Sequence, residues 1–273
     1  MRRRWRLGPG YRIAVFLLWP LMMAFTKRDW QGTENLNTDD GGIIVAVNHI
    51  SWFDPLVIAH VLWDNDRPPR FLAKESVFRV PIAGSIIRSA GQIPVYRETR
   101  EAVAAVRDAI TAVDAGECVV VYPEGTITKD PGLWPMAGKT GAARIALATG
   151  RPVVPMAQWG ATEVIAPYKK ELRLIPRKTM HVRVGKPVDL SDLAELPMDQ
   201  ATLEIATSRI LDAMTQLLAV IRDEQPPSER YRPGRKRAEN GASADVPNGN
   251  APNGNAPSGD APNGDAPNGE VTP

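Results

Sequence analysis

Short apolar runs alternate with helix-like segments through most of this chain. The runs Ile43–Val47, Cys118–Val121 and Val153–Ala157 are long enough for buried strands and too short for most helices. Between two of them, Arg100–Ala115 carries apolar residues at helical spacing and stops at Gly116. Such alternation predicts an α/β fold, in which a mixed, largely parallel sheet is flanked by helices.

The same patterns give the remaining elements. We expect further strands at 70–73, 92–95 and 180–184, and helices at 52–63, 77–89 with an interruption at Pro81, 140–149 and 199–222. In folds of this class, sites form beyond the carboxyl ends of the strands. His49, Arg97 and Glu124 each follow a predicted strand, so a common site is expected there.

His49 and Asp54 stand directly after the first strand, five positions apart. A carboxylate that accepts from one imidazole nitrogen leaves the other nitrogen to take a proton from a substrate hydroxyl. Among the three histidines of the chain, only His49 has a carboxylate so placed. The stretch also fits a helix-capping box with Ser51 at the N-cap. The two interpretations are compatible, because a cap would fix the turn that carries His49 back towards Asp54.

Four short blocks resemble the signature blocks of the glycerolipid acyltransferases, a family that includes the 1-acylglycerol-3-phosphate acyltransferases. In chain order they are Asn48-His49-Ile50-Ser51-Trp52-Phe53-Asp54, Gly91–Arg97, Tyr122–Thr126 and Val153–Met156. They follow the order of that family and span roughly residues 41–186.

The resemblance implies a reaction. A fatty acyl group would pass from a thioester, acyl-CoA or acyl carrier protein, to the sn-2 hydroxyl of 1-acylglycerol-3-phosphate, forming phosphatidate. His49 would be the general base and Asp54 would orient its ring. The expected partners are membrane lipids, lysophosphatidate and the acyl thioester; no cofactor, metal or nucleic acid is expected. Another lysolipid or an amino-acid lipid is the alternative acceptor, and a non-enzymatic membrane-binding protein is the less favoured alternative.

An acceptor pocket is also implied by the resemblance. Arg97 is the expected phosphate contact, because a planar guanidinium matches phosphate oxygens in a bidentate fork. Glu124, Gly125, Thr126 and Gly91 would help to form the pocket.

One position departs from the family pattern. Ile127 follows Thr126, where the family usually has an arginine or a small polar residue. Lys129 or Lys139 is expected to supply the missing charge. Three further residues of the blocks are expected to be donor-binding or structural, namely Asn48, Ser51 and Pro155.

The amino-terminal segment combines charge with apolar surface. Residues 1–28 hold seven basic side chains and no acid, around the apolar run Ile13–Phe25. That run is shorter than the apolar stretch of a membrane-spanning helix. It is not followed by the small-residue cleavage site that a secretory signal peptide would have. We therefore expect residues 1–32 to lie in one leaflet, at the cytoplasmic face of the cell membrane. The alternative is a buried amino-terminal helix of the globular domain.

The remaining domain boundary follows from composition. From Pro226 onward the chain is rich in proline, asparagine and glycine, with near-repeats of Ala-Pro-Asn-Gly. Such a segment buries too little apolar surface to offset the entropy of ordering, so we expect residues 226–273 to be disordered. Residues 33–225 are then the acyltransferase domain.

Overall fold

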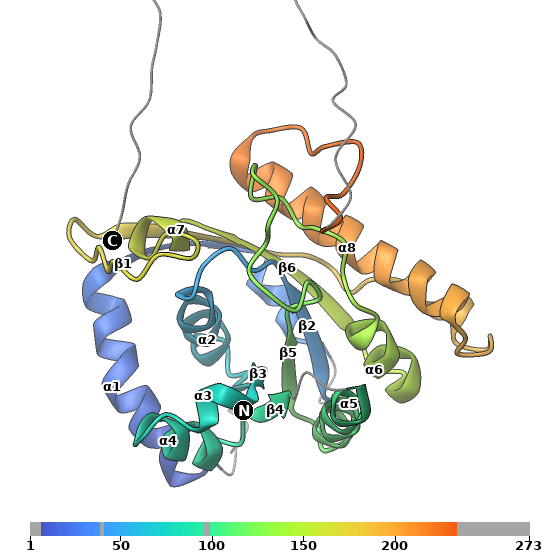
Figure 1. Ribbon diagram of the computed structural model, residues 1–273, viewed down its shortest axis with the longest axis horizontal. Helices are drawn as coiled ribbons and strands as arrows, with labels where there is room; N and C mark the ends of the chain where they lie inside the picture. Colours follow the sequence, from blue (N-terminus) through green and yellow to red (C-terminus); the bar gives the residue numbers. More distant parts are fainter. Residues whose placement is uncertain (1–6, 39–40, 96–98, 234–273) are drawn as a thin grey trace, which may run out of the picture. The chain divides into compact units, whose positions relative to one another are not determined.

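The computed structural model describes residues 7–38, 41–95 and 99–233. Within these residues seven strands form one sheet, in the order β1-β7-β6-β2-β5-β3-β4 (Figure 1). The strands are β1 Thr26–Gln31, β2 Ile43–Val47, β3 Pro69–Lys74, β4 Ile93–Val95, β5 Cys118–Val121, β6 Val153–Trp159 and β7 Lys178–Val184. Neighbouring strands run parallel except β6 and β7, which are antiparallel. The predicted mixed, largely parallel sheet is therefore confirmed.

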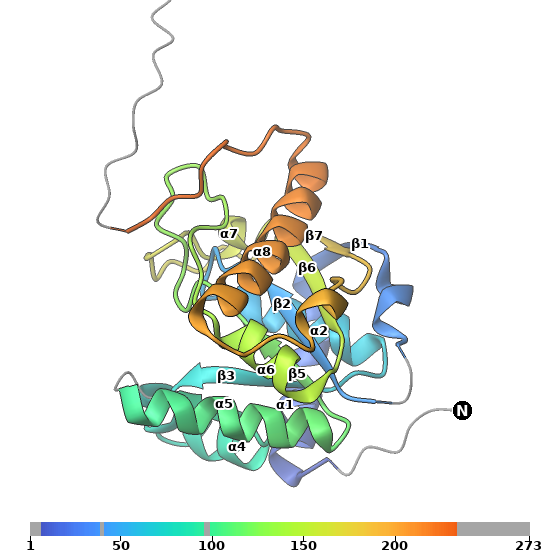
Figure 2. The same ribbon diagram turned by 90° about the vertical axis from the view of Figure 1, so that its right-hand side faces the viewer.

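Helices cover both faces of this sheet (Figures 1 and 2). They are α1 Pro9–Phe25, α2 Asp54–Asp64, α3 Glu75–Phe78, α4 Ala83–Ser89, α5 Thr99–Asp114, α6 Gly141–Thr149, α7 Ala161–Val164 and α8 Gln200–Arg222, with short 3₁₀ turns at Thr33–Leu36 and Ser191–Leu193. Helices α5, α6 and α8 pack on one face, and α1, α2 and α7 contribute to the core on the other.

The central strands β2 and β5 are apolar at every position because both of their faces are covered. In β2, Ile44 and Ala46 pack towards α5, α6 and α8, whereas Ile43, Val45 and Val47 pack towards α2. All five are fully buried. This packed centre carries the residues that follow β2 and β5.

Strand β1 and the helix predicted over 77–89 differ from the sequence prediction. The sequence pattern does not predict strand β1, because Thr26–Gln31 is mostly polar; it is an edge strand, and only one side pairs, with β7. The helix predicted over 77–89 is divided into α3 and α4 around Pro81, which lacks the N–H that a continuous helix needs.

Helix α1 is docked along one side. Tyr11 lies against Trp63 of α2, and the backbone N–H of Gly10 donates to Oγ of Ser89 in α4 over 3.0 Å. Met22 is buried in the core. No helix of the described ranges has the length and apolar content needed to cross a bilayer.

The described chain continues past α8. Residues 226–233, expected to be disordered, are placed, and the carbonyl of Tyr231 accepts from the N–H of Ala137 over 2.9 Å. Arg230 pairs with Asp212 of α8. The Ala-Pro-Asn-Gly repeats lie outside the described residues.

Candidate active site

His49 and Glu124 lie at one edge of the sheet, just beyond the carboxyl ends of β2 and β5. These strands are parallel neighbours, so their ends meet. The backbone N–H of His49 donates to Oε1 of Glu124 over 3.0 Å. The first and third sequence blocks are therefore in contact, as predicted. Arg97, which follows β4, lies outside the described residues.

Asp54 holds the imidazole of His49. It is fully buried, and its Oδ2 lies 2.8 Å from Nδ1 of His49. The same oxygen accepts from the N–H groups of Ile50 and Ser51, over 2.6 Å and 2.8 Å. Burial raises the pKa of Asp54, and the hydrogen bond from His49 opposes that shift. Because Nδ1 is engaged, Nε2 is the ring nitrogen left to exchange a proton with a ligand.

The turn between β2 and α2 keeps this geometry fixed. The N–H of Ser51 donates to Asp54, which is one half of the predicted capping box. The other half differs, since Oγ of Ser51 accepts from Phe53 N–H and donates to the carbonyl of Ile165. These contacts assign Ser51 a structural part.

Two further block residues are also structural. Asn48 is fully buried and exchanges two hydrogen bonds with the backbone of Gln158 in β6, over 2.8 Å and 3.1 Å. Pro155 is buried within β6, opposite Ala46 of β2. Both fix the end of β2 against β6 and so support the turn that carries His49.

The ring of Tyr122 stacks against the imidazole of His49. The two rings stack with centroids 4.3 Å apart and planes inclined by 27°. Burial raises the pKa of Tyr122 well above its ordinary value. Within the described part of the chain, neither the buried hydroxyl of Tyr122 nor Oδ1 of Asp54 has a hydrogen-bond partner. Tyr122 opens the third sequence block, yet its contact with His49 is visible only once β2 and β5 are paired.

Glu124 links two loops rather than standing open to a ligand. Its Oε1 accepts from His49 N–H, and its Oε2 accepts from Met136 N–H over 3.1 Å. The carbonyl of His49 accepts in turn from Thr128 N–H over 2.7 Å. Burial raises the pKa of Glu124 to about 8, against the opposing effect of its backbone donors. These contacts give Glu124 a positioning role, and its expected role in the acceptor pocket stays a prediction.

The residues after Glu124 turn back to the surface. Gly125 has φ of 68°, a conformation that favours glycine, and a Cβ built there would lie 3.2 Å from Cε of Lys139. Thr126, Lys129 and Lys139 are exposed.

Ile127 is only 3% exposed, so this position faces the interior and suits an apolar side chain. Of the two lysines expected to supply a charge here, Lys139 is the one whose side chain lies beside Gly125.

Gly91 lies away from this edge. It precedes β4, at the amino-terminal end of that strand, and its φ of 72° marks a turn. Its carbonyl accepts from Arg70, which also pairs with Glu117. In the described structure Gly91 turns the chain into β4, and its contact with an acceptor stays a prediction.

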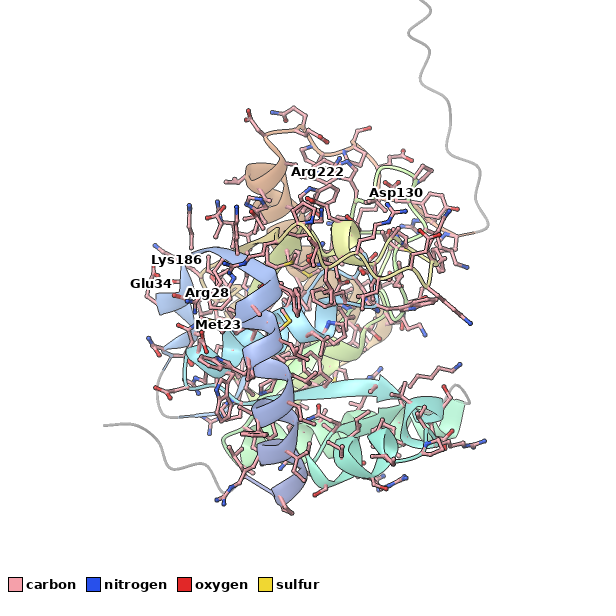
Figure 3. The ribbon with its side chains drawn as sticks, turned by 90° about the vertical axis from the view of Figure 1, so that its left-hand side faces the viewer. Met23, Arg28, Glu34, Asp130, Lys186 and Arg222 are labelled. Carbon is pink, nitrogen blue, oxygen red and sulfur yellow. The ribbon has the colours of Figure 1, made fainter. Side chains whose placement is uncertain are left out.

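Arg222 holds the loop that contains Met136 through cation–π contacts and a hydrogen bond. The guanidinium of Arg222, at the end of α8, lies 4.2 Å from the ring centre of Trp134 and 4.5 Å from that of Trp159. Its Nη1 donates to the carbonyl of Gly132 over 2.6 Å. Figure 3 labels Arg222 and also Asp130, which belongs to the loop that contains Met136. Asp130 accepts from the N–H groups of Gly132 and Trp134. No local sequence pattern indicates these contacts, because Arg222 is far along the chain from the residues that it binds.

The other two histidines also meet carboxylates. Nδ1 of His181 in β7 lies 2.7 Å from Oδ2 of Asp29 in β1, directly opposite in the sheet. Nε2 of the buried His60 lies 3.6 Å from Asp64. The sequence prediction that only His49 has such a carboxylate was wrong. Asp29 is on another strand and far from His181 along the chain, whereas Asp64 is only four positions from His60, on the same helix. No group of three His, Cys, Asp or Glu side chains suited to a metal ion occurs in the described ranges.

Comparison with known proteins gives concordant similarities. The family model described as Acyltransferase matches residues 27–159. Over 185 residues the chain is 33% identical to the chloroplastic 1-acyl-sn-glycerol-3-phosphate acyltransferase BAT2 of Brassica napus, covering 67% of this chain and 51% of that protein. A 1-acyl-sn-glycerol-3-phosphate acyltransferase of Borreliella burgdorferi is 27% identical over 183 residues, covering 67% and 70%. The chain spans about half the length of the first curated relatives that it matches.

A solved structure is similar in fold. The crystal structure of the 1-acyl-sn-glycerophosphate (LPA) acyltransferase PlsC from Thermotoga maritima superposes with a TM-score of 0.57, covering 77% of this chain and 79% of that one. At 22% identity, this likeness establishes the shared fold.

Proposed function

Residues 27–159 match the family model described as Acyltransferase, and on that basis we propose that this chain transfers a fatty acyl group from a thioester donor to the sn-2 hydroxyl of 1-acylglycerol-3-phosphate. The product is phosphatidate, and the donor is acyl-CoA or acyl carrier protein. The observation that carries the proposal is the His49–Asp54 pair, with Nδ1 bound to a buried carboxylate at 2.8 Å.

For this reaction the protein has mainly to transfer a proton and to position the two substrates. Nε2 of His49 takes the hydroxyl proton as the oxygen attacks the thioester carbonyl. The tetrahedral intermediate then collapses, the carbon–sulfur bond breaks, and the imidazolium returns the proton to the leaving thiolate. Asp54 stabilises the imidazolium between these steps. General base catalysis of this kind contributes on the order of 10²–10⁴-fold.

Acceptor recognition needs a cation for the phosphate. Lys139 supports this proposal because it is exposed beside Gly125, the residue that directly follows the carboxylate bound to His49 N–H. Arg97 remains the proposed second contact by its place in the second block. Thr126, exposed on the same turn, is proposed to donate a hydrogen bond to the acceptor.

Membrane attachment is proposed through α1. One side of this helix is docked on α2 and α4, while Phe16 is 79% exposed and Leu17 and Leu21 are each 52% exposed. Figure 3 shows α1 crossing one face of the molecule, with Met23 and Arg28 at one end. A helix with an apolar outer side and basic flanks suits one leaflet of an anionic membrane, which supports the proposal that the chain attaches to the cytoplasmic face of the cell membrane.

A transfer assay with a panel of acceptors tests the proposal. The full chain, in detergent micelles, is given acyl-CoA or an acyl carrier protein thioester as donor. The acceptor is lysophosphatidate, lysophosphatidylglycerol, a lyso amino-acid lipid or monoacylglycerol. Thiol release and lipid product are both measured. We expect the highest kcat/KM with lysophosphatidate and little transfer to monoacylglycerol, which lacks the phosphate. Preference for another lysolipid would move the proposal to that acceptor, and no transfer with either donor type would contradict it.

A further inference from the structure

The stretch between α7 and β7 has the composition of a membrane-docking loop. Residues 165–178, termed the 165–178 segment, contain five basic residues and one acid. The acid, Glu171, is paired with Arg173. Among these charges, Ile175 is 82% exposed, Leu172 is 57% exposed and Tyr168 is 54% exposed. Large apolar side chains gathered at this exposure, within a basic surround, are typical of an interaction surface.

This segment lies between α1 and the candidate active site. At one end, Nη2 of Arg177 donates to the carbonyls of Met23 and Thr26, in the last turn of α1 and just after it. At the other end, the hydroxyl of Tyr168 donates to the carbonyl of Ile127 over 2.7 Å. The carbonyl of Ile165 accepts from Ser51, in the turn that carries His49.

We propose that the 165–178 segment is a second membrane-docking element that binds anionic phospholipid, with Leu172 and Ile175 entering the leaflet and Lys169 and Lys170 at the headgroup phosphates. The direction of docking rests on the proposed attachment of α1, because Arg177 joins the segment to the end of that helix. Charge and apolar surface together favour a lipid surface of negative charge over a neutral one. Two attachments, at α1 and at this segment, fix the tilt of the molecule and hold the edge that carries His49 close to the leaflet.

The partner is a bilayer rather than a soluble acidic protein because the surface continues into α1. Phe16, Leu17 and Leu21 expose a row of apolar side chains on the helix that Arg177 ties to the segment. An acidic carrier protein would use the lysines of the segment but has no need of the apolar side of α1. Vesicle binding and carrier-protein kinetics separate the two partners.

Vesicle binding by the full chain is the direct test. Sedimentation is measured with phosphatidylcholine vesicles and with mixed phosphatidylcholine–phosphatidylglycerol vesicles. Replacing Lys169 and Lys170 by Gln should weaken binding to the mixed vesicles about fivefold for each lysine, with a smaller effect at high salt. Leu172→Ser with Ile175→Ser should weaken binding to both vesicle types about tenfold. Matched controls are Arg107→Gln on α5 and Val220→Ser on α8, both exposed and on helices of the opposite face; these should bind as the wild type does.

Insertion is measured with a fluorophore. Cys118 is fully buried, so an environment-sensitive label should react with the new thiol of Leu172→Cys. We expect a blue shift on addition of mixed vesicles and none for the label at Val220→Cys. An unshifted label at residue 172, with vesicle binding intact in the lysine variants, would overturn the inference.

Two outcomes separate this inference from the proposed function. If the label shifts while the wild type transfers no acyl group, docking stands and the reaction is wrong. If transfer in micelles is normal but the segment variants raise KM only for acyl carrier protein thioesters and leave vesicle binding unchanged, the segment is a carrier-protein site and the membrane inference fails.

Discussion

Two His–Asp pairs in this molecule have nearly the same nitrogen–oxygen distance, 2.8 Å for His49–Asp54 and 2.7 Å for His181–Asp29. Their surroundings differ. Asp54 is fully buried, whereas both side chains of the His181–Asp29 pair are more than a third exposed. Asp54, at the start of α2, also accepts from two backbone N–H groups of the preceding turn, whereas Asp29 lies on an edge strand and shares its oxygens with Arg183.

The comparison teaches that a short His–Asp distance does not define a base. Exposed ion pairs are screened and contribute little, and a second cation at Asp29 competes for the same carboxylate. At His49, the buried carboxylate and the stacked ring of Tyr122 restrict the imidazole, and the bond to Glu124 fixes the backbone that carries it. We therefore expect substitutions around His49 to act on catalysis, and substitutions around His181 to act weakly on stability.

Asp54→Asn should give the largest effect among the partners of the two histidines. A neutral amide keeps the size of the side chain but cannot stabilise the imidazolium, so kcat should fall by about 10²-fold or more. The measurement is phosphatidate formation in micelles, with circular dichroism to establish that the variant is folded. Activity within a few-fold of wild type would remove the distinction between the two pairs.

A substitution at Glu124 tests the surroundings of His49 through the free energy of unfolding. Glu124→Ala leaves the N–H groups of His49 and Met136 without their acceptor, and should cost about 1–3 kcal/mol in the free energy of unfolding. The pKa of Glu124 is raised to about 8 from an ordinary 4.5, so the folded state holds its proton more tightly. Its contribution to stability is present below the ordinary pKa and is lost as the pH rises through about 8.

The pH dependence of Tm measures that contribution. Wild-type Tm should contain a component that declines between pH 4.5 and about 8, and Glu124→Gln, which does not titrate, should lack it. Parallel profiles for the two proteins would show that Glu124 is ionised throughout in the folded state.

Tyr122 should have an intermediate effect. Tyr122→Leu removes the aromatic stack, worth about 0.5–1.5 kcal/mol, and should lower kcat between about twofold and tenfold by freeing the ring of His49. Tyr122→Phe keeps the stack and removes the buried hydroxyl, so it should retain most of the activity. If Phe and Leu are equally poor, the hydroxyl, rather than the stack, positions the histidine.

Asp29→Asn should give the smallest effect. Hydrogen bonds from His181 and then Arg183 lower the pKa of Asp29. The stabilisation is therefore present above the ordinary pKa of 3.8 and is lost as the pH falls through the lowered value. Because the pair is exposed, we expect less than about 1 kcal/mol near neutral pH, with no change in kcat. Urea unfolding and the transfer assay measure both; a large loss of activity would make this pair part of the site.

Much of the fold follows from local sequence, and much of the site does not. Strands β2 and β5 and the first five residues of β6 are continuous apolar runs, and the His49–Asp54 pair is close along the chain, so local patterns predict both. Local patterns do not predict strand β1, because an edge strand that pairs on one side need not be apolar. Glu124 is predictable as a site residue, but its link to Met136 depends on a loop whose path is set by Arg222, far beyond it along the chain.

Turnover of His49→Ala beside His181→Ala tests the central claim most directly. Both proteins are assayed with the same acyl-CoA and lysophosphatidate, after their folding and vesicle binding have been shown to match the wild type. We predict that His49→Ala loses about 10²–10⁴-fold in kcat and that His181→Ala stays within about twofold of wild type. Near-normal turnover by a folded His49→Ala variant, or equal losses in the two variants, would contradict the account.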